Sequence, residues 1–204
     1  MQKLQMHNRY LYKGGNAMYF AVLDTETNWK NEVMSLGLVI ANQYFLPEVK
    51  CYYIFTPEYK VGGMFSKTLQ NVQSKGVNKY IDTRSEIIAN IRNLFTQYGI
   101  NAIFAYNARF DLSHLPELKD YKWHDIMRIA AYKQYYGKIP EDIECHSHSG
   151  RIKRGFGVQP IYRMVTGDAD YKEKHNGYHD AEDELVIMQK LELPIEIYAN
   201  SKIN

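Results

Sequence analysis

The sequence predicts an α/β domain in which five strands form a mixed sheet with helices on its faces. Short runs rich in β-forming residues come first in the chain. Segments with apolar residues at helical spacing then alternate with two further short runs. This order is typical of a mixed sheet covered by helices. A length of 204 residues fits one domain.

Five segments have the composition of strands: 18–23, 32–40, 49–55, 101–106 and 123–125. The first is a continuous apolar and aromatic run, which predicts a buried central strand. Short turns separate the first three segments, as in a meander. We expect residues 1–16 to form an N-terminal arm, residues 17–193 the folded domain and residues 194–204 a C-terminal tail.

The clearest helix begins after Thr83, which forms a capping box with Glu86. Apolar residues at helical spacing follow until Gly99 ends the helix. We expect further helices at about 107–115, 126–136, 159–165 and 179–191. Segments 56–78, 138–157 and 168–177 are expected to be loops, and the first of them either covers a site or only connects two elements.

The composition excludes several classes of protein. A hydrophobic fraction of 45% with 14% aromatic residues excludes a disordered chain. Two cysteines provide no disulfide framework, and the sequence shows no signal-peptide core or apolar run of membrane length. The net charge of +2 gives no strong basic field for nucleic acid. We therefore expect a soluble cytoplasmic protein without a membrane partner.

Acidic residues stand beside apolar elements in three distant segments. Asp24 and Glu26 follow the first strand run two positions apart, so they project from the same face. Asp111 follows the fourth strand run, and Asp180 stands at the start of the last helix. If the first and fourth strands are parallel neighbours, these acids meet at the carboxyl end of the sheet. Crowded carboxylates need a counter-charge, which a divalent cation with oxygen ligands supplies.

Each of these residues also has an ordinary structural explanation. Asp24 and Glu26 suit a strand that ends in solvent, and Asp111 suits the first turn of a helix. Asn107 and His175, taken alone, suit a turn and a surface loop. The metal site is favoured only when the segments are considered together.

Together the segments resemble the three motifs of the DEDDh (DnaQ-like) 3′–5′ exonuclease superfamily, which includes the polymerase III epsilon exonuclease domain and ribonuclease T. Residues 24–27, D-T-E-T, resemble the first motif, and residues 107–111, N-A-R-F-D, resemble the second. His175, with Asp180 five positions later, resembles the third. The resemblance covers residues 17–192 and implies a ribonuclease-H-like fold.

The resemblance also implies a site for two Mg²⁺ or Mn²⁺ ions about 4 Å apart. By this resemblance, Asp24 bridges both ions and Asp111 binds one of them. Glu26 and Asp180 bind the other ion, and His175 is the general base. Residues beside these positions are expected to contact the substrate: Thr25, Thr27, Trp29, Asn107, Phe110.

Two features depart from the family pattern. The first motif usually continues with Thr and Gly, but this chain has Asn28 and Trp29. Trp29 is therefore expected to stack on a base, with altered backbone contacts to the substrate. In the third motif, His179 and Asp183 form an alternative pair. Family spacing favours His175, which leaves His179 as an exposed residue of the first helical turn and Asp183 as a solvated one.

Other polar residues have weaker functional signals. Arg151 and Arg154 are expected to hold substrate phosphates, although a solvated basic turn explains them almost as well. Cys145, His146 and His148 are too few and too isolated to predict a zinc site. Phe110 is expected mainly in the core, although the family motif allows a mixed role.

The sequence thus predicts a metal-dependent 3′–5′ exonuclease that acts on single-stranded DNA or RNA ends and releases nucleoside 5′-monophosphates. The family includes members that pair or join polymerases, so a homodimer or a polymerase or repair partner is compatible with it. The alternative is a catalytically silent module of the same fold that binds nucleic acid or protein. A complete set of four acids and a histidine favours the enzyme, because a silent module gains nothing from crowded like charges.

Overall fold

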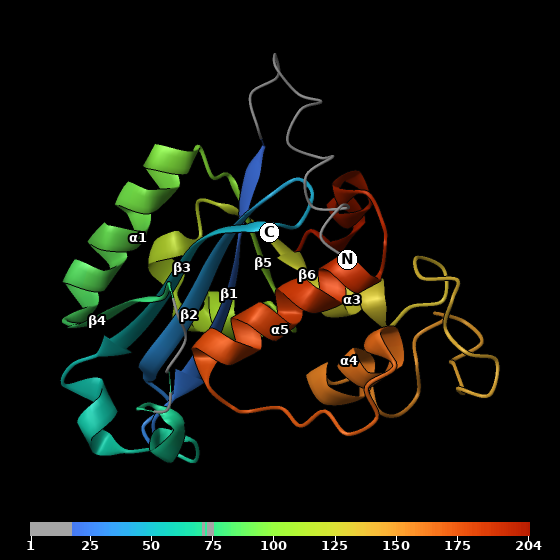
Figure 1. Ribbon diagram of the computed structural model, residues 1–204, viewed down its shortest axis with the longest axis horizontal. Coiled ribbons are helices and arrows are strands. Elements are labelled where there is room, and N and C mark those ends of the chain that lie inside the picture. Colours follow the sequence, from blue (N-terminus) through green and yellow to red (C-terminus); the bar gives the residue numbers. More distant parts are fainter. Residues whose placement is uncertain (1–17, 71, 73–75) are drawn as a thin grey trace.

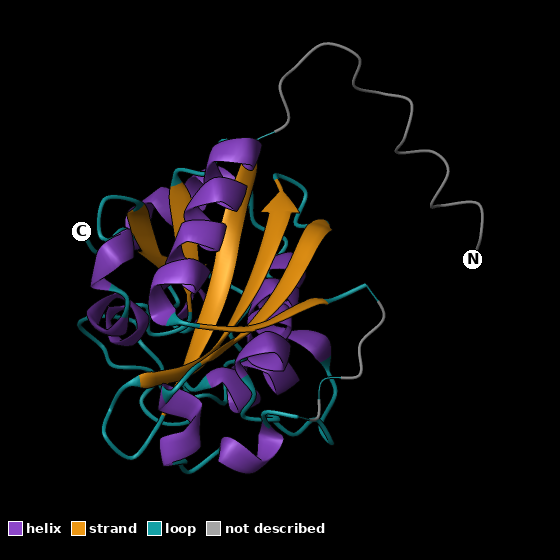
Figure 2. Cartoon of the chain, turned by 90° about the vertical axis from the view of Figure 1, so that its left-hand side faces the viewer, coloured by secondary structure: helices purple, strands orange, loops and turns teal. Residues whose placement is uncertain are grey.

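The computed structural model describes residues 18–70, 72 and 76–204, so the predicted arm at 1–16 lies outside the described residues. A six-stranded mixed sheet forms its centre, in the order β4-β3-β2-β1-β5-β6 (Figures 1 and 2). Its strands are β1 (Tyr19–Thr27), β2 (Val33–Asn42), β3 (Pro47–Phe55), β4 (Asn78–Asp82), β5 (Ala102–Ala105) and β6 (Lys122–Asp125). Strand β2 is antiparallel to β1 and β3, whereas β5 is parallel to β1 and β6. The predicted α/β architecture, a mixed sheet with helices on its faces, is confirmed.

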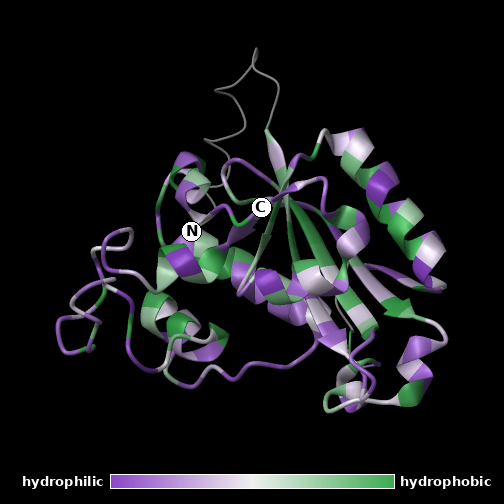
Figure 3. Ribbon diagram, turned by 180° about the vertical axis from the view of Figure 1, so that it is seen from behind, coloured by the Kyte–Doolittle hydropathy of each residue, from purple (hydrophilic) through white to green (hydrophobic). Residues whose placement is uncertain are grey.

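In the described part of the chain, five α-helices surround this sheet: α1 (Arg84–Tyr98), α2 (Arg109–His114), α3 (Ile126–Ala130), α4 (Val158–Thr166) and α5 (Gly177–Lys190). Short 3₁₀ helices occur at Glu58–Val61, Ser66–Thr68, Pro116–Leu118 and Ile195–Ser201. The capping box of Thr83 and Glu86 starts α1, and Gly99 ends it in the left-handed conformation. Hydrophobic residues run along the central strands, and the helices present mixed faces (Figure 3).

The strands bury side chains on both faces, in two separate clusters. Phe20 and Val22 of β1 pack with α3 and α5 on one face, and Ala21 and Leu23 pack with α1 on the other. This alternation follows from the two-residue period of a strand. It places Asp24 and Glu26 on the α5 face of β1, and Thr25 on the opposite face.

Helix α5 crosses the sheet in close contact with β1 and β2 (Figure 1). Two glycines allow this approach. A Cβ atom added to Gly37 of β2 would lie 2.0 Å from the carbonyl oxygen of Gly177, the first residue of α5. Gly37 is also the register partner of Asp24. The first turn of α5 therefore lies against the part of β1 that holds the acids.

The structure corrects several element predictions. The sheet has six strands because β4, which begins at the last residue of the predicted loop 56–78 and was not predicted, pairs in parallel with β3. Strand β1 continues through both acids to Thr27 instead of stopping before them. Helix α3 ends at Ala130, not near 136, because Ala131 and Lys133 form backbone hydrogen bonds with Ile152 and Gly150.

Residues 194–204, expected to be a tail, pack against the sheet edge. Tyr198 and Ser201 are buried, and the backbone of Ile203 donates to the carbonyl oxygen of Trp123 in β6. The Asn204 side chain donates to the carbonyl oxygens of Lys119 and Tyr121. None of the helices in the described part of the chain has the length and apolar character that a membrane span requires.

Candidate metal and nucleic-acid site

A cleft of about 370 Å³ lies at the carboxyl end of β1. Its walls come from β1 and the turn after it, the β3–β4 connection, the β5–α2 junction and the segment that leads into α5. The four predicted metal ligands and the predicted general base all line it. The lining residues are Asp24, Thr25, Glu26, Thr27, Asn28, Trp29, Met64, Phe65, Tyr106, Asn107, Phe110, Asp111, Glu173, His175 and Asp180.

Asp111 enters the cleft from α2, which follows β5. Its side chain is 1% exposed. Its Oδ1 atom accepts hydrogen bonds from the Thr25 hydroxyl at 2.7 Å and the Thr25 backbone N–H at 3.1 Å. Thr25 faces α2 because it alternates with the two acids along β1. The residue between the two acids of the first motif thus fixes the acid of the second.

Asp180 enters the cleft from the first turn of α5. Its Oδ2 atom accepts a hydrogen bond of 2.8 Å from the backbone N–H of Asn176. The Asn176 side chain in turn caps the helix by accepting from the backbone N–H of Tyr178. The other oxygen, Oδ1, is buried and has no hydrogen-bond partner among the described residues. One oxygen of Asp180 is therefore held in place while the other is available for a ligand.

The acids in the cleft destabilise one another's ionised forms. Burial, followed by repulsion from Glu173 and Asp111, raises the pKa of Glu26 to about 7. Burial, followed by repulsion from Glu173 and Glu26, raises the pKa of Asp180 to about 8. Burial and nearby acids also raise the pKa of Asp24 well above its usual range.

Burial raises the pKa of Asp111 to about 7 even though its bonds to Thr25 favour the ionised form. No lysine or arginine among the described residues lines the cleft. A cluster of this kind at neutral pH requires cations or protons.

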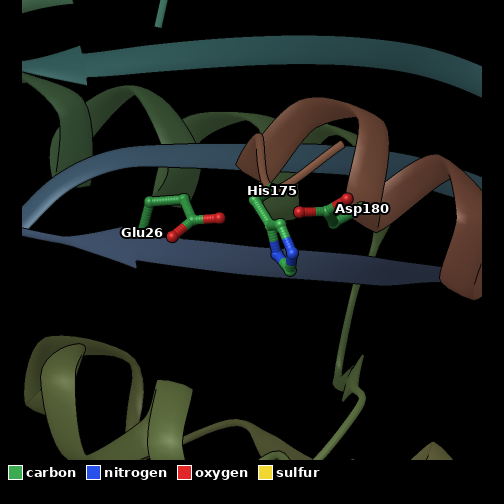
Figure 4. Close-up of side chains that lie close together, drawn as sticks. All are labelled: Glu26, His175 and Asp180. Atoms are coloured by element: carbon green, nitrogen blue, oxygen red, sulfur yellow. The ribbon is translucent and has the colours of Figure 1, made fainter. Parts of the chain in front are cut away.

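The donor set fits a divalent cation. Ligand atoms of Glu26, His175 and Asp180 all lie within 4.8 Å of one another (Figure 4). Opposite oxygen ligands of an octahedral Mg²⁺ are about 4.2 Å apart, because each Mg–O distance is about 2.1 Å. Asp24 and Asp111 line the same cleft but lie outside this trio. The cleft is thus lined by five side chains that carry oxygen or nitrogen atoms able to bind a cation.

His175 precedes α5 and has a positive φ of 50°. In Figure 4 its ring lies between the carboxylates of Glu26 and Asp180. Phe65 stacks on this ring, with 4.2 Å between ring centroids and 16° between planes. The Thr68 hydroxyl donates to the His175 carbonyl oxygen at 2.6 Å. Residues 64–68 of the predicted loop therefore cover part of the site and hold His175, so this part of the loop does more than connect two elements.

Three exposed apolar side chains form a rim around the acids. Trp29 is 69% exposed, Met64 69% and Phe110 41%. Phe110 is not a core residue, contrary to expectation, because α2 is short and lies at the end of the sheet. Asn28 uses its side chain to hold the turn after β1, with bonds to Glu32 and the carbonyl oxygen of Glu58. The turn presents Trp29 at the rim.

Several residues that the sequence analysis considered for a binding or metal site lie outside the cleft. Arg151 stacks over Phe156, and Arg154 lines a separate hollow beside Glu144. Neither arginine lines the cleft. Cys145 forms an isolated β-bridge with Ile152 and belongs to no metal-ligand cluster among the described residues.

The alternative pair of His179 and Asp183 also lies outside the cleft. Asp183 accepts a hydrogen bond of 2.6 Å from the Tyr171 hydroxyl, so it is not a solvated residue. His179 is only 14% exposed and lies 3.8 Å from Glu182, so it is not an exposed one. The geometry places His175, rather than His179, beside the acids.

Two acids near the site were not predicted. Glu173 lines the cleft and its carboxylate lies 3.8 Å from Nδ1 of His175. Glu184 is fully buried on α5, one helical turn after Asp180. The sequence spacing could have indicated its location, because Glu184 follows Asp180 by four residues and residues i and i+4 share one side of a helix. Nothing in the sequence around Glu173 distinguishes it from an ordinary loop residue.

No family model matches the chain, and no curated protein is similar to it in sequence. Among solved structures, it is similar to E. coli exonuclease I in complex with a 5cy-dT13 oligonucleotide, with 16% identity and a TM-score of 0.48 over 86% of this chain. It is also similar to exonuclease I in complex with the inhibitor BCBP, with 16% identity and a TM-score of 0.49 over 91% of this chain. The chain spans 40% and 44% of those two proteins, respectively.

Proposed function

We propose that the protein is a divalent-metal-dependent 3′–5′ exonuclease that hydrolyses single-stranded DNA or RNA from its 3′ end and releases nucleoside 5′-monophosphates. The main support is that acids from three distant segments, Asp24 with Glu26, Asp111 and Asp180, line one cleft with His175. The polarity of degradation and the products follow from the resemblance of these segments to the DEDDh motifs.

In this proposal Asp24, Glu26, Asp111 and Asp180 hold two Mg²⁺ or Mn²⁺ ions. When bound, the ions stabilise the charge that develops on the attacking and leaving oxygens at phosphorus. The oxygen donors and the absence of thiolates in the cleft suit these hard cations.

His175 accepts a proton from the attacking water. Its ring lies in the cleft beside Glu26 and Asp180, and its side chain remains 45% exposed, so water reaches it. The Glu173 carboxylate lies 3.8 Å from Nδ1 of the same ring. General base catalysis of this kind typically contributes a factor of about 10²–10⁴ to the rate.

The rim of Trp29, Met64 and Phe110 supplies stacking surfaces for the last nucleotides of a single strand. Each base stacked on an aromatic side chain contributes about 1–3 kcal/mol without reading the sequence. No lysine or arginine among the described residues lines the cleft, so the substrate phosphates depend on the cations for charge compensation.

The test is degradation of matched, 5′-labelled DNA and RNA single strands by the purified full chain with Mn²⁺. We expect stepwise shortening from the 3′ end, loss of activity in EDTA, and protection of strands with a 3′-phosphate. The Asp24→Ala variant is expected to be inactive, and His175→Ala is expected to be slower by about 10²–10⁴-fold. His179→Ala is the matched control and should retain activity.

Three results would contradict the proposal. Binding of the strand without nucleotide release would favour the silent binding module. Internal cleavage of the 3′-blocked strand would indicate an endonuclease. Equal losses in the two histidine variants would remove the assigned role of His175.

A further inference from the structure

Glu184 is an acid that none of the three motifs includes. It lies on α5 one helical turn after Asp180, so the two side chains share one side of the helix. Its side chain is 0% exposed and does not reach the cleft surface. Helix α5 packs directly against β1 and β2, and Glu184 lies in the interior of the protein.

The surroundings of Glu184 oppose a negative charge. Neither of its side-chain oxygens has a hydrogen-bond partner of normal geometry among the described residues. Burial raises the pKa of Glu184 well above its usual range, and repulsion from Asp111, Asp180 and Asp125 adds to this effect. A contact with the backbone amide of Tyr106 acts in the opposite direction and lowers the pKa of Glu184. A buried carboxyl group in this state costs stability unless a cation is near.

Glu184 belongs to the same electrostatic cluster as the motif acids. After burial, Glu184 is the group that most raises the pKa of Asp24, ahead of Asp111, Asp180 and Glu26. Asp24 lines the cleft, so it interacts both with the other cleft acids and with the buried Glu184.

Asp180 also has a carboxylate oxygen without a hydrogen-bond partner. Oδ1 of Asp180 is buried without a hydrogen bond, as are both oxygens of Glu184 one turn later. Three carboxylate oxygens on one side of α5 thus lack donors in the described structure. Because no donor among the described residues reaches these oxygens with normal hydrogen-bond geometry, a divalent cation is a partner that would satisfy them together.

We propose that Glu184 is a fifth carboxylate of the metal site, which strengthens the binding of divalent cations from the interior side of the cleft. This inference rests on the proposed metal-dependent function, but it concerns cation binding alone. Glu184 acts through the ions and through Asp24 and Asp180, so it is a positioning residue and does not contact the substrate.

The test is the affinity of the full chain for Mn²⁺, measured by isothermal titration calorimetry without nucleic acid. The variants are Glu184→Gln, which keeps the shape and removes the charge, and Glu184→Met, which also removes the polar atoms. Glu182→Gln is the matched control, because Glu182 lies on the same helix but pairs with Lys50 outside the cleft. Melting in EDTA verifies that each variant is folded.

We expect both Glu184 variants to bind Mn²⁺ about 10–100-fold more weakly than the original protein, and Glu182→Gln to bind within about twofold of it. We also expect both Glu184 variants to melt at a higher temperature in EDTA, because an unpaired buried acid has been removed. The same weakening should appear as a higher Mn²⁺ concentration at half-maximal nucleotide release.

Unchanged Mn²⁺ affinity in both folded Glu184 variants would overturn the inference, while nucleotide release by the original protein would still support the proposed function. Mn²⁺ binding that depends on Glu184, in a protein that releases no nucleotide, would support the inference and contradict the proposed function. The two ideas therefore fail on different measurements.

Discussion

Neutralising Glu26 should stabilise the metal-free protein at alkaline pH but not at acidic pH. Burial and neighbouring acids raise its pKa from 4.5 to about 7 in the folded chain. The folded state therefore binds more protons than the unfolded state between these values, and stability falls as pH rises through this range. A rise of this size corresponds to about 3 kcal/mol at pH 8. Glu26→Gln removes that cost.

The assay is thermal unfolding in EDTA at pH 4 and pH 8. For a protein of this length, about 3 kcal/mol corresponds to a rise of about 6–12 °C in Tm. We expect this rise for Glu26→Gln at pH 8 and little change at pH 4, where both side chains are neutral. Glu196→Gln, at an exposed position, is the control and should behave like the original protein at both values.

Saturating Mn²⁺ should reverse the order at pH 8. The original protein gains stability from the bound cation, and Glu26→Gln loses a ligand and gains less. The reasoning is refuted if the variant shows the same Tm difference at pH 4 and pH 8 in EDTA. It is also refuted if Mn²⁺ stabilises both proteins equally.

Three other substitutions have defined outcomes. Gly37→Ala forces α5 away from β2, so we expect a loss of about 1–3 kcal/mol in denaturant unfolding and lost nucleotide release, whereas Gly137→Ala, in open space, should be neutral. Phe65→Ala removes the ring stacked on His175, so kcat should fall about 10–100-fold in steady-state assays. Phe65→Tyr keeps an aromatic ring and should restore kcat. An unchanged kcat in Phe65→Ala would contradict this role. Trp29→Ala should raise KM for single strands about 5–100-fold with kcat preserved, and a fall in kcat alone would exclude a stacking role.

The positions of the motif acids were predictable because they depend on local geometry. The two-residue period of a strand sets Asp24 and Glu26 on one face of β1, and the parallel pairing of β1 with β5 brings Asp111 to the same end of the sheet. The start of α5 delivers Asp180. These arrangements follow from short segments and from one topological assumption that the structure confirms.

The features that were missed depend on contacts between distant segments. Glu184 looks like a polar helix residue in the sequence, and its burial follows from the approach of α5 to the sheet at Gly37 and Gly177. Strand β4, N-K-Y-I-D, is mostly exposed at the sheet edge, so it lacks the apolar alternation that marks a strand.

The long helix predicted after Ile126 stops early for a similar reason. Its sequence continues to favour a helix, but residues 131–133 pair with residues 150–152 instead. Tertiary pairing of this kind outweighs local propensity and leaves no periodic signal.

The contact between Gly37 and Gly177 separates the site into two parts with different mechanical properties. Main-chain atoms meet directly there, with no intervening side chain to rotate or compress. Side-chain rearrangements elsewhere therefore leave the distance between Asp24 of β1 and Asp180 of α5 unchanged. His175 lies just before this anchored turn and depends on Phe65 and Thr68 from the β3–β4 connection. Displacement of that connection would move the imidazole and leave the floor of carboxylates unchanged.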